Sequence, residues 1–148
     1  DNYFLSGYTD AMSLSGLVFA GGNAAWLGKK KVDGVLGGVL TAKDIANLDF
    51  KGTDLMVLSA CKTGQGKVTA EGVFGLQRAF KKAGVGTIIM SLWKVDDKVT
   101  SEFMTTFYER LADKDNNWNK RKAFEEAKEI IRKEHPDPYY WAAFVMLD

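Results

Sequence analysis

The sequence predicts an α/β fold in which helices flank a mostly parallel sheet. Residues 54–60 (Asp-Leu-Met-Val-Leu-Ser-Ala) and residues 87–92 (Thr-Ile-Ile-Met-Ser-Leu) are apolar runs of strand length, typical of strands buried on both faces. Between them, Val73, Leu76 and Phe80 recur at helical spacing, and Gly84 follows as a stop signal. Strand, helix and strand within about forty residues form a βαβ unit, in which the two strands are parallel.

The other elements are predicted from turn signals and from hydrophobic spacing. Three precede the βαβ unit: a short strand at 14–20, an extended connection or surface hairpin at 21–40, and a short helix at 41–48 that begins with a Thr-x-x-Asp pattern. Four follow it: a helix at 98–112, a polar turn at 113–117, a helix at 120–134 that Pro136 and Pro138 end, and a final strand at 140–147.

The composition indicates one globular domain or a large part of one. The chain has 148 residues, 46% apolar and 26% charged, with a formal net charge of +1, so no strong positive field would attract nucleic acid. No apolar stretch is long enough to cross a membrane, and the first ten residues lack the pattern of a signal peptide. A single cysteine is typical of a reducing compartment, and we expect a cytoplasmic protein.

Motifs for phosphate, dinucleotide and metal binding are incomplete. Residues 22–29 resemble a P-loop, but five residues separate the glycines instead of four, and Lys30 stands where Ser or Thr is required. Residues 64–69 begin a dinucleotide fingerprint, but Thr69 replaces its third glycine. One histidine and one cysteine, far apart in the sequence, do not make a closed metal site. We therefore expect no cofactor and no metal.

Cys61 follows directly on the first buried strand. Reactive groups in open α/β sheets lie at the carboxyl ends of strands, so Cys61 is either an inert core thiol or a nucleophile. The loop after the second strand, Trp93-Lys-Val-Asp-Asp97, is expected at the same edge. The only histidine, His135, precedes the final strand. If that strand were parallel to the others, His135 would lie at the opposite edge and would be a poor base for Cys61.

Several segments of the chain together resemble the CHAT domain, a family of caspase-like cysteine peptidases often found behind TPR repeats. These segments are Ser15-Gly-Leu-Val-Phe-Ala-Gly-Gly-Asn23, residues 33–45, Val57-Leu-Ser-Ala-Cys-Lys-Thr-Gly-Gln-Gly66, Glu71-Gly-Val-Phe-Gly-Leu-Gln-Arg-Ala-Phe80, Ser91-Leu-Trp-Lys-Val-Asp-Asp97 with Thr100, and Tyr140-Trp-Ala-Ala-Phe-Val145. They occur in the family's order and cover nearly the whole chain.

The resemblance implies a caspase-like α/β/α sandwich and a polypeptide substrate, cleaved by a Cys–His dyad. Cys61 is similar to the family's nucleophile, and its own backbone N–H to one oxyanion donor. Asp97 matches an acidic position that borders the pocket for the residue before the cleaved bond, which would favour a basic residue there. The residues alone offer a second interpretation of Asp97, as the N-cap of the helix at 98–112.

The family's dyad histidine lies in a His-Gly pair upstream of the strand at 14–20, and His135 does not match it. We therefore expect residues 1–148 to be the carboxyl-terminal portion of one CHAT domain, incomplete and inactive alone. An exposed sheet edge would then bind the missing amino-terminal half or a second copy of the chain. Two alternatives stay open: a non-catalytic scaffold or oligomerisation module, and a redox-sensing thiol.

Overall fold

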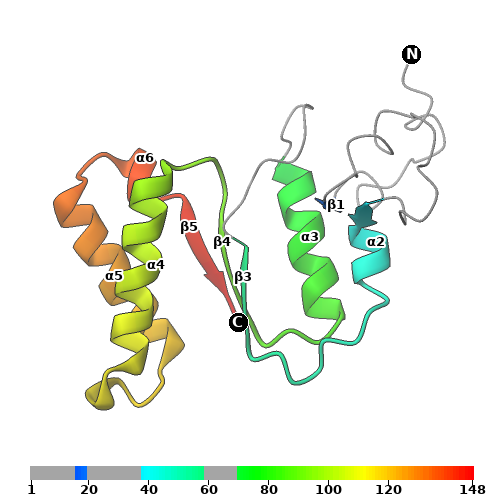
Figure 1. Ribbon diagram of the computed structural model, residues 1–148, viewed down its shortest axis with the longest axis horizontal. Helices are drawn as coiled ribbons and strands as arrows, with labels where there is room; N and C mark the ends of the chain where they lie inside the picture. The colour runs from blue at the N-terminus through cyan, green and yellow to red at the C-terminus, as the bar shows by residue number, and fades with distance from the viewer. Residues whose placement is uncertain (1–15, 20–37, 59–69) are drawn as a thin grey trace. The chain divides into compact units, whose positions relative to one another are not determined.

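The computed structural model describes residues 16–19, 38–58 and 70–148 (Figure 1). The chain divides into two compact units. One unit comprises Asp1–Asp54 with Lys62–Gly86, and the other comprises Leu55–Cys61 with Thr87–Asp148. Both contain helices and strands, so the predicted α/β class is confirmed.

The first unit begins with two short antiparallel strands. Strand β1 (Gly16–Val18) pairs with β2 (Val39–Thr41), and Gly16 lies opposite Thr41. A Cβ atom at residue 16 would lie 2.5 Å from the Leu40 carbonyl oxygen, so this close pairing requires glycine. Strand β2 falls at the end of the stretch predicted as a connection or hairpin; residues 20–37 of that stretch lie outside the described residues.

Two helices complete the first unit. Helix α2 (Ala42–Ile45) has the predicted capping box, in which the Asp44 backbone N–H donates to Thr41 Oγ1 and the Thr41 N–H donates to Asp44 Oδ2. Helix α3 (Ala70–Lys82) buries Leu76 and Phe80, as its spacing predicted. It ends at Gly84, whose φ of 107° is the left-handed conformation expected of a glycine stop.

The second unit is built on a three-stranded sheet of order β3-β4-β5. Strands β3 (Leu55–Leu58) and β4 (Thr87–Ser91) are parallel, as predicted. Strand β5 (Phe144–Leu147) runs antiparallel to β4, with Phe144 opposite Ser91. The described sheet is therefore mixed, and the expectation of a mostly parallel sheet was wrong for its last strand.

The direction of β5 follows from the two helices that precede it. Helix α4 (Asp97–Ala112), the 3-10 turn η1 (Lys114–Asn116) and helix α5 (Lys120–Glu134) separate β4 from β5. A short connection between two helices that pack together makes them antiparallel (Figure 1). The chain therefore returns to the edge of the sheet that it left, and β5 enters from there.

The segment before β5 also differs from the prediction. Residues 138–141, expected to lie in or just before the final strand, form the short helix α6 (Pro138–Trp141). Asp137 is its N-cap and accepts a hydrogen bond from the Tyr139 backbone N–H, while Pro138 occupies the first helical position. Pro138 ends no helix here; it begins one.

An aromatic core holds the helices against the sheet. The rings of Phe103 from α4 and Phe144 from β5 stack at 4.0 Å between centroids, and Phe124 from α5 meets Phe103 edge-on at 5.5 Å. All three are almost fully buried, in one cluster with Ile89 of β4. Helices α4 and α5 therefore cover one face of this sheet. Among the described helices, none is both long and apolar enough to cross a membrane.

Candidate functional site

The carboxyl edge of the sheet is the candidate site. Leu58, the last described residue of β3, lies opposite Met90, one residue before the end of β4. The carboxyl ends of the two strands are therefore adjacent, as the βαβ unit predicted. Cys61 comes three residues after Leu58 and lies outside the described residues. The loop after β4 is described, and so is the segment that leads into β5.

The loop after β4, residues 92–97, is anchored at several points. The Leu92 backbone N–H donates to the carbonyl oxygen of Ala143, at 2.9 Å, and the Val95 side chain is buried in the aromatic core. Asp96 is the N-cap of α4, and its carboxylate accepts a hydrogen bond from the Lys98 N–H at 2.9 Å. A loop held in this way presents the next residue, Asp97, in a defined position.

Asp97 is the first residue of α4 and not its cap. The N-cap interpretation was therefore wrong by one residue, because Asp96 takes that role. The Asp97 side chain is exposed, and within the described part of the chain its carboxylate forms no hydrogen bond or ion pair. A carboxylate in the first turn of a helix interacts favourably with the helix dipole, and the exposed position of Asp97 leaves its carboxylate accessible to a ligand.

The antiparallel direction of β5 places the segment 135–143 at this same edge. Two reciprocal hydrogen bonds tie this segment to the loop. The Trp93 indole Nε1–H donates to the carbonyl oxygen of Tyr139 at 2.9 Å, and the Tyr139 hydroxyl donates to the carbonyl oxygen of Lys94 at 2.6 Å. The two rings lie 6.3 Å apart between centroids. Tyr139 was not singled out from the sequence. The two helices predicted between the second buried strand and the final strand were a signal that could have placed it at this edge.

His135 also belongs to this edge, which removes the geometric reason for excluding it. Its described partner is Glu102 of α4: Nε2 lies 2.9 Å from the carboxylate oxygen, and both side chains are about one third exposed. Its ring lies 5.4 Å from that of Tyr140. His135 thus links the end of α5 to α4.

Among the described residues, three side chains could together approach a metal ion. The ligand atoms of Glu102, Glu134 and His135 lie within 4.8 Å of one another, a set that the sequence argument did not consider. Imidazole and carboxylate are donors that divalent transition metals accept. However, His135 and Glu102 already pair, and the Lys98 ammonium group lies 3.8 Å from the second Glu102 oxygen. Glu102 is therefore already bonded to His135 and Lys98, which favours a structural role for these side chains.

A shallow surface groove of about 250 Å³ lies beside α5 and α6, lined by Glu125, Lys128, Glu129, Arg132 and Trp141. Lys128 and Arg132 both lie 5.9 Å from the Trp141 ring, and Arg132 also pairs with Glu129. Positive and negative charges balance in this groove, and its lining has no thiol or hydroxyl group.

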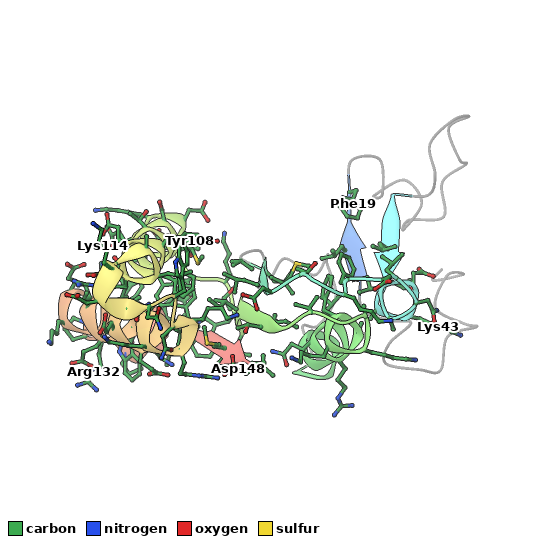
Figure 2. The ribbon with its side chains drawn as sticks, turned by 90° about the horizontal axis from the view of Figure 1, so that it is seen from below. Phe19, Lys43, Tyr108, Lys114, Arg132 and Asp148 are labelled. Carbon is green, nitrogen blue, oxygen red and sulfur yellow. The ribbon has the colours of Figure 1, made fainter. Side chains whose placement is uncertain are left out.

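The opposite edge of the sheet is stabilised by an ion pair. Asp148 directly follows β5 (Figure 2) and accepts hydrogen bonds from the Arg121 guanidinium and the Thr87 hydroxyl. The Arg121 hydrogen bonds are the main cause that lowers the pKa of the Asp148 carboxyl from its ordinary value, and burial, the next-largest influence, opposes them. This pair tethers the end of β5 to α5.

Comparison with known proteins gives one family and two relatives. Residues 4–148 match the family described as the CHAT domain. Tetratricopeptide repeat protein 28 of Homo sapiens is 33% identical over 111 residues, and that of Mus musculus is 32% identical over 111 residues. Each alignment covers 74% of this chain but 4% of the relative, so the chain spans a small part of the curated relatives that it matches. No solved structure matches the chain.

Proposed function

Because the chain belongs to the CHAT domain family, we propose that it carries the nucleophile of a caspase-like cysteine peptidase, with Cys61 in that role. The observation that supports this proposal is the parallel pairing of β3 and β4. The segment that contains Cys61 follows β3, and the loop that ends at Asp97 follows β4, so both leave the sheet at one edge. Open α/β sheets bind ligands outside the carboxyl ends of their strands.

The proposed reaction is peptide-bond hydrolysis through an acyl-enzyme. The Cys61 thiolate attacks the peptide carbonyl carbon, and the Cys61 backbone N–H donates to the oxyanion as charge develops on it. A histidine accepts the thiol proton and later donates it to the leaving amine; water then releases the acyl group. The family resemblance assigns this role to the histidine of a His-Gly pair. His135 precedes Pro136 and pairs with Glu102, which suits a structural role.

Asp97 supplies the proposed preference for a basic substrate residue. Its carboxylate is exposed and has no partner within the described residues, whereas the neighbouring Asp96 carboxylate caps α4. An Arg or Lys side chain before the cleaved bond would pair with Asp97. A charged hydrogen bond of this kind contributes about 1.5–3 kcal/mol, which corresponds to at least about tenfold in rate.

The test is hydrolysis of peptides in which Arg or Lys directly precedes the cleaved bond, by a protein that includes the His-Gly segment. Cys61→Ala should lower kcat by more than about a thousandfold. Asp97→Asn should lower kcat/KM for the arginine peptide at least about tenfold relative to a neutral peptide. Asp96→Asn is the matched control, which should keep this preference. Hydrolysis that survives Cys61→Ala would overturn the proposal, and a folded wild-type protein without hydrolysis would favour a non-catalytic scaffold.

A further inference from the structure

Tyr139 has a position that core packing does not explain. Its side chain is 49% exposed, so burial contributes little to holding the ring in place. Its hydroxyl nevertheless donates to Lys94 at 2.6 Å, across 45 residues of sequence. Its own carbonyl oxygen accepts the Trp93 indole N–H. Both bonds are made to consecutive residues of the loop 92–97.

The segment that carries Tyr139 is itself well fixed. Pro138 at the first position of α6 has a restricted φ, and the Asp137 carboxylate caps the Tyr139 N–H at 2.9 Å. The Tyr140 ring meets the Tyr139 ring edge-on, at 5.5 Å between centroids. At the other end, β5 is paired with β4 and its first residue stacks on Phe103. A rigid segment can therefore restrain a loop that it contacts.

The loop depends on that restraint at Trp93 and Lys94, which lie between the anchored residues Leu92 and Val95. Val95 is held by burial and Asp96 by the helix cap, but Lys94 is exposed and Trp93 is only half-buried. Without the Tyr139 hydroxyl, the Lys94 carbonyl oxygen would have no side-chain or backbone donor among the described residues. The backbone of Trp93 and Lys94, which leads to the capped start of α4 and to Asp97, would then sample more conformations.

We infer that Tyr139 is a positioning residue of the proposed peptidase, which orients the loop 92–97 so that Asp97 meets the basic side chain of the substrate. This inference rests on the proposed function. Tyr139 does not touch the reacting atoms; it acts through the Lys94 carbonyl group. Its expected signature is therefore a loss of discrimination between basic and neutral substrates, without a loss of the chemical step.

The experiment compares Tyr139→Phe with wild type in the full-length protein, on an arginine peptide and on its norleucine counterpart. The phenylalanine keeps the ring and the main-chain carbonyl group and removes only the hydroxyl. We expect KM for the arginine peptide to rise about three- to tenfold, the effect of one lost hydrogen bond, with kcat and the norleucine reaction within about twofold of wild type. Tyr108→Phe is the matched control, because Tyr108 is 48% exposed on α4. Loss of its hydroxyl should leave the hydrolysis of both peptides unchanged.

A second variant tests the pair of bonds. Trp93→Phe removes the donor to the Tyr139 carbonyl oxygen. A protein with both Trp93→Phe and Tyr139→Phe should lose less discrimination than the sum of the two single losses, because both bonds hold one loop. If wild type prefers the arginine peptide and Tyr139→Phe keeps the same preference, the positioning role is wrong and the proposed function stands. The same conclusion follows if Tyr139→Phe lowers kcat/KM for both peptides by the same factor. If wild type hydrolyses neither peptide, both are wrong.

Discussion

Replacing Phe144 by alanine removes the ring by which β5 stacks on α4, in the core that α4 and α5 share. The side chain is 2% exposed, stacks on Phe103 with an interplanar angle of 1° and belongs to the cluster that includes Phe124. A buried Phe→Ala change costs about 3–5 kcal/mol, and the upper half of that range applies because a stacked aromatic pair is also lost. We therefore expect a loss of about 4 kcal/mol, a large part of the 5–15 kcal/mol typical of a domain.

The loss can be measured by urea unfolding followed by tryptophan fluorescence. Trp93 and Trp141 pack against the same core, so their emission reports on this unit. The midpoint of thermal unfolding should fall by about 8–16 °C. Leu147→Ala is the matched control on the other face of β5, where the side chain is only half-buried, and it should cost about 1–2 kcal/mol.

The comparison also tests the register of β5. The alternation of burial along this strand places Phe144 and Met146 on the face that α4 and α5 cover. A slip of one residue would exchange the two faces. A loss for Phe144→Ala no larger than that for Leu147→Ala would refute the register and the core described above.

Three further substitutions test local features. Asp96→Ala should lower the free energy of unfolding by about 1 kcal/mol in a urea titration because α4 loses its cap; an unchanged midpoint would contradict this. Gly84→Ala should lower the melting temperature more than Gly52→Ala. Both glycines have a positive φ, but only at residue 84 would a Cβ lie 3.0 Å from a backbone nitrogen. Equal shifts in melting temperature would refute this contact. Asp148→Asn should cost at most about 1 kcal/mol at pH 7, because the pair with Arg121 is exposed. Because the pKa of Asp148 is lowered in the folded state, this stabilisation is present at a pH above the pKa of the unfolded state, about 3.9, and is lost as the pH falls through the pKa of the folded state. The free energies of unfolding of wild type and Asp148→Asn should therefore converge in acid.

Most helix and strand positions could be predicted because their signals are local. The Thr41–Asp44 capping box and the Gly84 stop each depend on a few neighbouring residues, and the structure has both. The direction of β5 was missed because hydrophobic spacing identifies a strand but not its orientation. The information was nevertheless present in the chain, since two consecutive helices return it to the edge that it left.

The candidate site was predictable to a smaller extent. The parallel pairing that brings the two strand ends together followed from the βαβ pattern. Two adjacent aspartates, Asp96 and Asp97, are equally good caps by sequence, and only the non-helical backbone of Asp96 (φ −54°, ψ 137°) decides between them. The contact of Tyr139 with Lys94 involves a main-chain carbonyl group, which leaves no trace in the identity of the accepting residue.

The central claim, that Cys61 is a peptidase nucleophile, is tested most directly by locating a covalent adduct. A protein that joins this chain to the family's His-Gly segment is treated with a peptidyl ketone electrophile that ends in arginine, and the modified residue is identified by mass spectrometry. We predict one adduct within residues 1–148, on Cys61. Its rate of formation should fall by more than about a hundredfold when the histidine of the His-Gly pair is replaced by alanine. Modification of Cys61 at an unchanged rate in that variant, or peptide hydrolysis without any adduct at Cys61, would contradict it.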